Sequence, residues 1–223
     1  MLKRAFDITS SGLALIILAP ILLLTMLVLR LTGEGEIFFL QERMGYKNKP
    51  FNITKFATMV KSAAFMKAGD YTTKGDPRIL PVGKFLRKTK INEIIQLWDV
   101  FRGKMSLVGP RPQMLRVHNL YPDEYNVVFE KVRPGITGVG SIVFRDEEMV
   151  LTQAVDRDVC YTKQIVPYKA QLEMWYAENA SFILDIKIIF MTLWYIVKPE
   201  SRLMNKILPD HLQIDVSTFT GEI

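Results

Sequence analysis

The 223-residue sequence predicts a mainly helical α+β protein, with an N-terminal re-entrant membrane helix joined to a compact cytoplasmic domain. Three observations support this fold class. An uncharged apolar run lies near the N-terminus, two short strand-like segments flank a basic turn, and the second half of the chain shows helical spacing of apolar residues. The sequence therefore predicts one short β-hairpin and interfacial helices beside the membrane segment.

The membrane segment is the uncharged run LALIILAPILLLTMLVL, which extends over Leu13–Leu29. As a straight helix this run spans about 25 Å, slightly less than the ~30 Å hydrocarbon core of a bilayer. Pro20 lies in its middle, where a proline removes one backbone hydrogen bond and bends the helix. Basic residues occur on both sides of the run, at Lys3-Arg4 and at Arg30, and such residues favour the cytoplasmic face. The pattern favours a re-entrant helix over residues 1–32, kinked at Pro20.

A single spanning helix and a cleaved signal peptide are the alternatives for this segment. A signal peptide requires small residues at its cleavage site, and the run is followed instead by Arg30-Leu31-Thr32-Gly33-Glu34. A re-entrant helix must cover the backbone groups that its bend frees. The side chains expected to help are the hydroxyls of Ser10, Ser11 and Thr25.

Composition narrows the classes of function. The single cysteine, Cys160, excludes an intrachain disulfide and an all-cysteine metal site, and is typical of a small core residue. Two histidines, His118 and His211, argue against a histidine-built zinc centre, and no Gly-x-Ser-x-Gly elbow of a serine hydrolase occurs. The net charge of +6 indicates an anionic partner: a nucleic acid, a phosphate substrate or a membrane surface. No aromatic base-stacking platform accompanies the basic residues, so nucleic acid is not the expected partner.

Downstream of the membrane segment, the sequence predicts a hairpin and three longer helices. Residues 37–40 and 50–56 have strand character, and the basic residues 44–49 form the turn between them. The predicted helices cover residues 84–102, 167–179 and 182–197. The last of these is expected to lie at the membrane interface or to pack on the domain.

The helix over residues 84–102 carries the first candidate site. Apolar residues occupy one face, and the opposite face carries the polar side chains of Asn92, Gln96 and Asp99. Thr89 is the expected N-cap, which places Asn92 and Glu93 in the first turn. Free backbone N–H groups and the helix dipole favour a bound anion there.

Arginines in stiff loops form the second candidate site. Between Gln41 and Lys104, 14 Lys and Arg residues stand against 5 Asp and Glu residues, so this region is more basic than the chain as a whole. Two prolines fix the backbone around Arg111, which holds its guanidinium in a position suited to a phosphate. Arg133 begins a second stiff loop, Arg133-Pro134-Gly135-Ile136-Thr137-Gly138. A basic surface that faces acidic lipids is the alternative explanation of these charges.

The motifs of the chain and their order along it resemble those of the bacterial sugar transferases. These are the monotopic phosphoglycosyl transferases that begin capsule, exopolysaccharide and glycan assembly. The resemblance extends from Lys3 to about Val197. The matching motifs are Lys3-Arg4-x-x-Asp7, Phe38-Phe39-x-Gln41-x-Arg43-x-Gly45, Lys55-Phe56-x-Thr58-Met59, Asp76-Pro77-Arg78-Ile79, Val82-Gly83-Lys84-Phe85-Leu86-Arg87, Asn92-Glu93, Met105-Ser106-Leu107-Val108-Gly109-Pro110-Arg111-Pro112 and Arg133-Pro134-Gly135-Ile136-Thr137-Gly138.

The resemblance implies an enzyme that moves a sugar phosphate from a UDP-sugar to a polyprenyl phosphate and releases UMP, with Mg²⁺ as cofactor. It implies catalytic residues at Asn92 and Glu93, with Glu93 holding the metal. The residues that it implies for binding phosphate and nucleotide sugar are Lys55, Arg78, Arg87, Arg111 and Arg133. Cations at such a site make chemical sense, because splitting a diphosphate requires its oxygens to be neutralised.

The resemblance also implies a place and a domain organisation. The chain is expected in the bacterial inner membrane, in contact with membrane lipids, with its catalytic domain on the cytoplasmic face. The expected parts are the membrane helix over 1–32, the transferase domain over 33–198 and a C-terminal tail over 199–223. The sugar, the pathway and the oligomeric state are left open, with a homodimer among the options.

Three positions depart from the family pattern. Asn92 stands where the family has its aspartate nucleophile, Ala57 replaces an arginine, and Lys104 replaces an aspartate. A neutral carboxamide is a very poor nucleophile and a weaker ligand of Mg²⁺ than a carboxylate. Three explanations stay open: an active asparagine variant, an engineered trap, and a non-catalytic homologue that acts as a scaffold or partner subunit.

Overall fold

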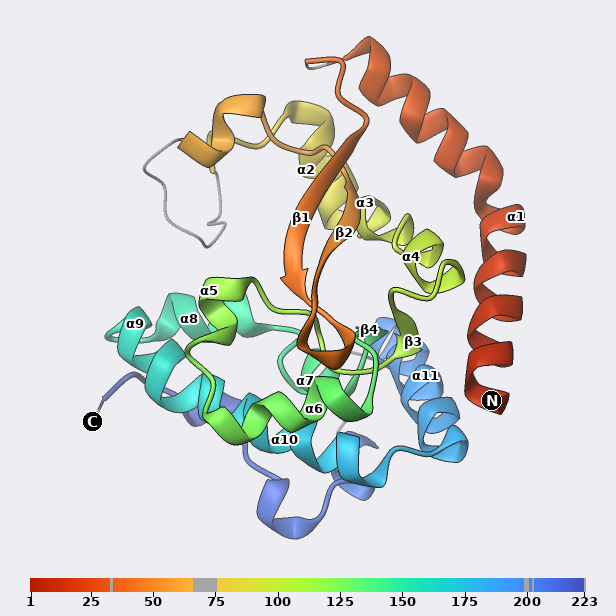
Figure 1. Cartoon of the computed structure of the whole chain (residues 1–223). Helices are drawn as coiled ribbons and strands as arrows, with labels where there is room; N and C mark the ends of the chain where they lie inside the picture. The colour runs from red at the N-terminus through yellow and green to blue at the C-terminus, as the bar shows by residue number, and fades with distance from the viewer. Residues whose placement is uncertain (33, 66–75, 199–200, 202, 223) are drawn as a thin grey trace. The chain divides into compact units, whose positions relative to one another are not determined.

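The computed structural model describes residues 1–223 except residues 33, 66–75, 199–200, 202 and 223. Its described part is mainly helical with two small two-stranded sheets, so the predicted α+β class is confirmed (Figure 1). The chain divides into two compact units. Unit 1 comprises Met1–Ala5, Arg43–Phe51 and Lys104–Ile223, and unit 2 comprises Phe6–Glu42 and Asn52–Gly103. The domain boundaries expected from the sequence remain predictions.

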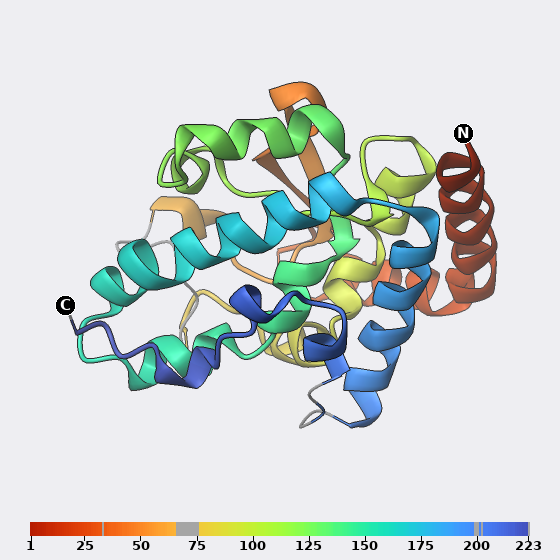
Figure 2. The same ribbon diagram turned by 90° about the horizontal axis from the view of Figure 1, so that it is seen from below.

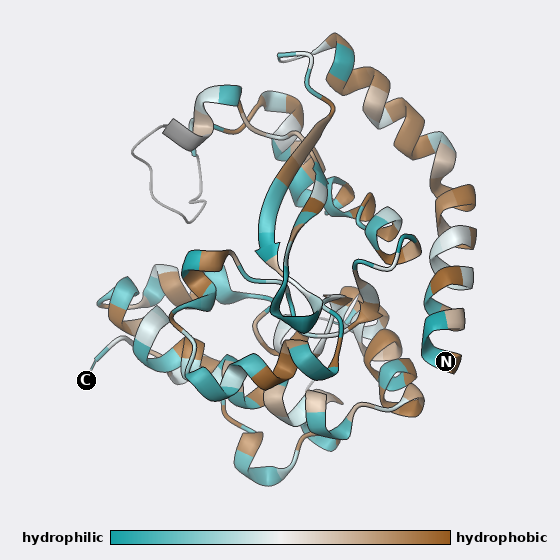
Figure 3. Cartoon of the chain, in the orientation of Figure 1, coloured by the Kyte–Doolittle hydropathy of each residue, from teal (hydrophilic) through white to brown (hydrophobic). Residues whose placement is uncertain are grey.

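The N-terminal apolar region forms one long helix, α1, from Leu2 to Leu31. Within the described part of the chain, α1 is long and apolar enough to cross a membrane, and most of its apolar stretch is not buried in the protein. Figure 3 colours most of this helix as apolar. Its ribbon bends along its length in Figure 1, and Pro20 lies inside it. Its length and composition therefore suggest a membrane helix.

Two of the hydroxyls in α1 do not serve the proline bend as expected. The Ser11 hydroxyl donates to the carbonyl of Asp7 (2.6 Å), and the Thr25 hydroxyl donates to the carbonyl of Ile21 (2.7 Å). Both acceptors lie four residues before the donor, whereas Pro20 frees the carbonyl of residue 16. The expectation for Ser11 and Thr25 was therefore wrong, because each hydroxyl bonds within its own turn.

The predicted hairpin is present, and its first strand is longer than expected. β1 (Phe38–Met44) pairs with β2 (Pro50–Phe56), and a single helical turn at Tyr46–Asn48 joins them. The turn places Lys47 and Asn48 at positive φ, which reverses the chain within a few residues.

The single helix predicted over residues 84–102 is wrong, because the chain forms three short helices there. These are α2 (Pro81–Lys88), α3 (Ile91–Ile94) and α4 (Leu97–Phe101). The break between the first two lies at Lys90, whose left-handed backbone (φ 59°, ψ 10°) cannot continue a helix. Thr89 is not the N-cap of α3. It ends α2, and its hydroxyl donates to the carbonyl of Phe85 (2.9 Å).

Unit 1 consists of helices arranged around a parallel pair of short strands. β3 (Ser106–Val108) pairs with β4 (Gly135–Thr137), with Ser106 opposite Gly135 and Val108 opposite Thr137. The helices are α5 (Leu115–His118), α6 (Asn126–Lys131), α7 (Val139–Val143), α8 (Glu147–Gln153), α9 (Arg157–Val159), α10 (Val166–Asn179) and α11 (Phe182–Val197). The two helices predicted over residues 167–179 and 182–197 are confirmed as α10 and α11.

The last helix has one buried and one exposed apolar face. Its buried side chains include Leu184, Ile188 and Met191, and its exposed ones include Phe190, Leu193 and Ile196. Packing on the domain, one of the two arrangements predicted for α11, is therefore present. Contact of the exposed face with lipid remains a prediction.

The C-terminal segment packs into unit 1 and runs along its helices (Figure 2). The Tyr168 hydroxyl of α10 donates to the carbonyl of Leu212 (2.7 Å), and the Val155 N–H donates to the carbonyl of Thr220 (2.8 Å). Met204, Leu208 and Leu212 are buried in the same core as α10.

Candidate active site

The first candidate site lies at α3, in unit 2. Asn92 is 8% exposed, and its Oδ1 atom accepts no hydrogen bond from the part of the chain that the structure describes. The neighbouring Glu93 lies 3.8 Å from the ammonium of Lys55 on β2. The side chains of Lys55 and Glu93 are 17% and 24% exposed. The start of this short helix thus carries a buried carboxamide oxygen at Asn92 and, at the next residue, a carboxylate paired with a lysine.

Burial around this site does not follow the two faces expected from the sequence. The expected polar face is buried, since Asn92, Gln96 and Asp99 are all inaccessible to solvent or nearly so. Asp99 accepts hydrogen bonds from the main-chain N–H (2.7 Å) and hydroxyl (3.2 Å) of Thr54. Two members of the apolar face, Trp98 and Phe101, are 43% and 40% exposed. Among these polar side chains, Asp99 is turned toward β2, where Thr54 supplies its donors.

Arg78 is held by a neighbouring carboxylate rather than presented to solvent. Its Nη2 atom lies 2.6 Å from Asp76 Oδ2, its Nε lies 3.0 and 3.1 Å from the two Asp76 oxygens, and its main-chain N–H also donates to Asp76 (2.9 Å). These hydrogen bonds hold the pKa of Asp76 below its usual range, although burial opposes the shift. The guanidinium of Arg78 is thus engaged inside the fold. A phosphate at the predicted site would have to share this guanidinium with Asp76.

Arg87 lies in the last turn of α2, close enough for its charge to lower the pKa of Asp76 as a minor contribution. The position of α2 depends on Gly83. A Cβ atom at Gly83 would lie 2.2 Å from the carbonyl oxygen of Thr58, so any larger residue would push the helix away. Two of the motifs noted in the sequence, around Thr58 and Gly83, therefore pack directly against each other.

Arg111 and Arg133 belong to unit 1, where glycines bring their loops together. A Cβ on Gly109 would lie 2.2 Å from the Arg133 carbonyl oxygen, and one on Gly138 would lie 2.2 Å from the Gly109 carbonyl oxygen. The loops approach this closely because glycine stands at both positions. The guanidinium of Arg133 lies over the ring of Tyr46, 4.6 Å from its centroid.

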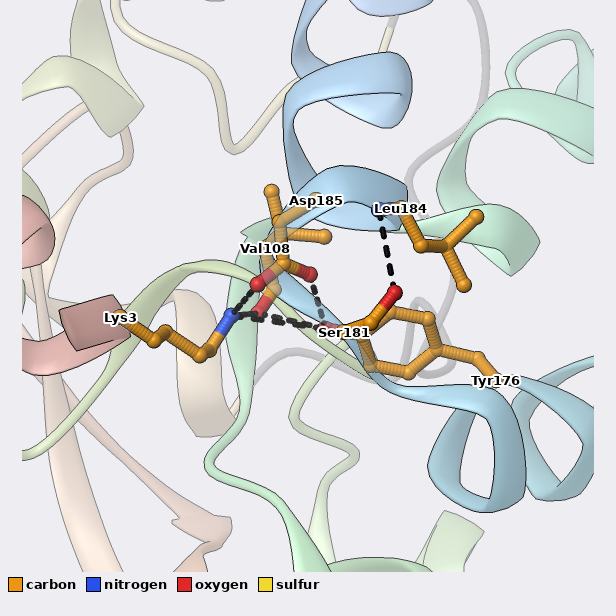
Figure 4. A network of polar contacts seen from close by, with 6 residues as sticks. All are labelled: Lys3, Val108, Tyr176, Ser181, Leu184 and Asp185. Atoms are coloured by element: carbon orange, nitrogen blue, oxygen red, sulfur yellow. Dashed lines mark hydrogen bonds and ion pairs between the residues drawn. The ribbon is translucent and has the colours of Figure 1, made fainter. Parts of the chain in front are cut away.

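A polar network that the sequence did not predict holds the strand before the Arg111 loop (Figure 4). Lys3 Nζ donates to Asp185 Oδ2 (2.5 Å) and to the Val108 carbonyl (3.0 Å), and the Tyr176 hydroxyl donates to Asp185 Oδ1 (2.6 Å). The network ties the first turn of α1 to the end of β3 and the start of α11. Its signal in the sequence is Asp185, one of the few polar residues in the apolar stretch 182–197.

The site at α3 has the donors for a sparse magnesium site. In the described ranges no group of three or more His, Cys, Asp and Glu side chains is arranged to hold a metal. Mg²⁺, however, commonly takes one or two carboxylates, several waters and the phosphates of a substrate. The half-buried carboxylate of Glu93, next to the unpartnered carbonyl oxygen of Asn92, fits that type of site.

The predicted site residues fall into two groups. Lys55, Arg78, Arg87, Asn92 and Glu93 belong to unit 2, and Arg111 and Arg133 belong to unit 1. Within unit 2, the structure brings Lys55 to Glu93, and it engages Arg78 with Asp76.

Comparison with known proteins identifies relatives, two of which are named for a reaction. The undecaprenyl-phosphate glucose phosphotransferase of Komagataeibacter xylinus is 38% identical, over 86% of this chain and 35% of that protein. The UDP-N-acetylgalactosamine-undecaprenyl-phosphate N-acetylgalactosaminephosphotransferase of Aeromonas hydrophila is 31% identical, over 86% of this chain and 43% of that protein. An exopolysaccharide production protein, PSS, of Rhizobium leguminosarum bv. phaseoli is 34% identical, over 86% of this chain and 94% of that protein.

The chain thus spans less than half the length of the first two relatives and nearly the whole of the third. The family described as bacterial sugar transferase matches residues 1–199, which include all the motifs discussed above. The chain therefore belongs to the bacterial sugar transferase family.

Proposed function

We propose that this protein transfers a sugar phosphate from a UDP-sugar to a polyprenyl phosphate and releases UMP, as the first membrane step of polysaccharide or glycan assembly. Two of the relatives named above are named for undecaprenyl phosphate, a polyprenyl phosphate, and one of these is also named for a UDP-sugar. The observation that carries the proposal is the Lys55–Glu93 pair at α3, where Glu93 directly follows Asn92 and its buried carboxamide oxygen.

The Lys55–Glu93 pair is suited to binding a ligand. At 3.8 Å and with both side chains partly exposed, it contributes little to stability, so either partner can turn to a ligand at low cost. Lys55 would donate to a phosphate oxygen of the UDP-sugar, while Glu93 and the Asn92 carbonyl oxygen would hold Mg²⁺. When bound, Mg²⁺ would neutralise the charge that builds on the diphosphate oxygens.

Position 92 decides between two forms of the reaction. An aspartate there would attack the phosphorus that carries the sugar and break the bond to UMP. It would keep the phosphosugar until the polyprenyl phosphate attacks in turn. The carboxamide of Asn92 carries no negative charge for this attack, so a chain with asparagine would require direct transfer between the two substrates.

A second candidate function is a non-catalytic or impaired homologue that acts as a membrane scaffold. Asn92 favours this function, because it removes the nucleophile that the family resemblance implies. The retained Glu93, Arg87 and Gly109-Pro110-Arg111-Pro112 argue against it, because a scaffold needs none of them.

UMP release separates these functions. The assay uses a panel of UDP-sugars, with and without polyprenyl phosphate, and compares the unchanged chain with Asn92→Asp. We expect Asn92→Asp to release UMP at least about ten-fold faster and to gain a sugar-phosphate adduct, visible in the intact mass. Asn119→Asp, which adds the same charge at an exposed position, is the matched control. No turnover in either form would favour the scaffold.

Turnover by the unchanged chain without an adduct would have a different meaning. It would support direct transfer, and Glu93→Gln should then abolish it, because Glu93 is the carboxylate at the start of α3. Arg87→Ala and Arg111→Ala should each weaken UDP-sugar binding far more than Lys47→Ala or Lys49→Ala, since arginine offers a planar fork of donors. Equal effects at all four positions would indicate only a diffuse basic field.

For membrane placement, we propose a re-entrant α1 with both ends on the cytoplasmic face of the inner membrane. Cysteines at Leu2 and Glu34, in a chain with Cys160→Ala, would be labelled from each side of sealed vesicles. Labelling of both from the same side supports the proposal, and labelling from opposite sides establishes a spanning helix. Pro20→Ala should straighten α1 and increase the spanning fraction.

A further inference from the structure

Glu173, in the middle of α10, is a carboxylate in the core of unit 1 that touches the main chain of two other elements. It is 3% exposed. The backbone N–H groups of Arg111 and Gly140 donate hydrogen bonds to it. Gly140, in the first turn of α7, leaves no room for a larger residue, because a Cβ there would lie 2.4 Å from Glu173 Oε1. The carboxylate therefore connects the main chain of the Arg111 loop to the start of α7.

The cation that could neutralise Glu173 is shared with another acid. Lys169, one turn earlier on α10, is buried, and its ammonium donates to Glu147 Oε2 (2.5 Å). The same ammonium lies 4.9 Å from the centroid of the Phe144 ring. When both acids are ionised, Lys169 therefore faces two negative charges. The guanidinium of Arg111 adds positive charge nearby, since it lowers the pKa of Lys169 as a minor contribution to an effect dominated by burial.

The surroundings of Glu173 make its ionisation adjustable near neutral pH. Burial raises the pKa of Glu173 to about 7, although the N–H groups of Arg111 and Gly140 and the charge of Lys169 oppose the shift. Its Oε2 atom and the hydroxyls of Tyr121 and Tyr125 are buried, and none of the three has a hydrogen-bond partner among the residues that the structure describes. The titratable and charged groups around it are Lys169 on α10, Glu147 on α8, Arg111 after β3, Tyr121 and Tyr125 between α5 and α6, and Tyr161 before α10.

We propose that Glu173 is a positioning residue for phosphate binding, which holds the Arg111 main chain against α7 while its carboxylate is ionised and so fixes where the Arg111 guanidinium meets a phosphate. The proposal rests on the function proposed above, because it takes Arg111 as a ligand of the UDP-sugar diphosphate. It adds a regulation to that site, since proton uptake in the core would loosen a loop that binds substrate.

The physical reason is the difference between the two protonation states. An ionised carboxylate accepts strong, charge-assisted hydrogen bonds from the two N–H groups, whereas a neutral carboxyl group accepts weaker ones. If only the ionised form holds the loop, the apparent affinity is reduced by the fraction of protein in that form. With a pKa of about 7, that fraction falls about ten-fold between pH 8 and pH 6.

The test measures binding of UDP-glucose to the full chain in detergent micelles between pH 6 and pH 8. Both phosphates of UDP-glucose are esterified and stay ionised over this range, so the probe does not titrate. We expect wild-type affinity to be about ten-fold lower at pH 6 than at pH 8. Glu173→Gln should bind with low affinity throughout and lose this pH dependence. Glu178→Gln, the same change at an exposed position of α10, is the matched control, and His118→Gln tests for a histidine contribution.

Hydrogen exchange at the Arg111 and Gly140 amides tests the structural link without any ligand. Both amides should exchange faster in Glu173→Gln than in wild type at pH 8 and should not differ from wild type in Glu178→Gln. A wild-type affinity that does not change with pH, or a Glu173→Gln variant with the wild-type profile, overturns the proposal. If Arg111→Ala binds UDP-glucose normally, the phosphate role of Arg111 fails. That failure can be distinguished from failure of the Glu173 proposal, because hydrogen exchange at the Arg111 amide would still respond to Glu173→Gln.

Discussion

Asp76 in unit 2 and Glu173 in unit 1 are both 3% exposed, and the pKa values of their carboxyl groups shift in opposite directions. Asp76 receives side-chain and main-chain donors from Arg78, and its pKa lies below the usual range. Glu173 receives two main-chain N–H groups, but its nearest lysine, Lys169, is bonded to Glu147, and burial raises its pKa to about 7.

The difference shows that depth in the protein and the supply of cationic donors together decide whether an acid shielded from solvent is permanently charged. Arg78 gives Asp76 both guanidinium and main-chain N–H donors, so that pair acts as a fixed structural link. The lysine near Glu173 faces two acids, so one of them keeps a proton over part of the physiological pH range. A permanently charged pair such as Asp76–Arg78 is suited to stabilising the fold. An acid with too few cationic donors, such as Glu173, is suited to regulation by pH.

Breaking the fixed pair should have the largest effect on stability. Asp76→Ala would leave the buried guanidinium of Arg78 without its carboxylate, and we expect the thermal midpoint in detergent to fall by about 10 °C. Asp76→Ala combined with Arg78→Met should recover part of this loss, because the uncompensated charge is then removed. A midpoint that does not change in Asp76→Ala would show that the pair is not a structural link.

Removing the Glu173 carboxylate should have a smaller effect on the thermal midpoint, and of the opposite sign. A carboxyl group with a raised pKa in the folded state destabilises the fold as pH rises from about 4.5 to about 7. Glu173→Gln lacks this loss, so its midpoint should exceed that of wild type by about 3–5 °C at pH 8 and match it near pH 5. The opposite sign holds for Asp76. Because its pKa is lowered in the folded state, Asp76 stabilises the fold above about pH 4, and this stabilisation is lost at lower pH. A Glu173→Gln midpoint that tracks wild type at every pH would contradict the comparison.

Replacing Lys169 should shift the pH dependence of UDP-glucose binding without abolishing it. Lys169→Met removes the positive charge that favours ionised Glu173, so the inflection in UDP-glucose affinity should move upward by about one pH unit. Lys163→Met, on an exposed side chain two turns earlier, should leave the inflection in place. A downward movement in Lys169→Met would mean that Lys169 does not neutralise Glu173.

The smallest effect should come from an ion pair on the surface. Lys61 and Glu36 lie 2.8 Å apart, but their side chains are 59% and 54% exposed. The hydrogen bond from Lys61 lowers the pKa of Glu36, yet solvent screens such a pair. We expect Lys61→Ala to leave the thermal midpoint unchanged within error in a standard melt. A drop in the thermal midpoint comparable to that of Asp76→Ala would show that the number of cationic donors alone does not rank how much these pairs stabilise the fold.

Elements with a simple local signal could be predicted from the sequence. The hairpin was predictable because strand-forming residues flank a basic turn, and α10 and α11 were predictable from their apolar spacing. The break at Lys90 was not, because a left-handed residue other than glycine or asparagine has no clear signature. The buried orientation of Asp99 in α4 depends on β2, which offers it the main-chain N–H of Thr54.

The site residues show the same limit. Asn92, Glu93 and Lys55 could be named from their motifs, and the structure pairs Lys55 with Glu93, while the role of all three in catalysis stays a prediction. The closed pairing of Arg78 with Asp76, two residues away, was not foreseen, although the short spacing allows it. Glu173 was missed because sequence patterns do not reveal which charged residue of a helix is buried. The available signal was a lysine and a glutamate four residues apart among buried apolar residues of α10.

The network at Lys3 bears on how this protein can be prepared. A common way to obtain a soluble piece of a membrane enzyme is to remove its N-terminal helix. Here that cut would also remove the ammonium that neutralises Asp185, whose side chain is 4% exposed, and would leave the Tyr176 hydroxyl facing an uncompensated charge. Because Met1–Ala5 belongs to unit 1 and the rest of α1 to unit 2, the helix is not a detachable anchor. A shortened chain would need Asp185→Asn to replace what Lys3 supplies.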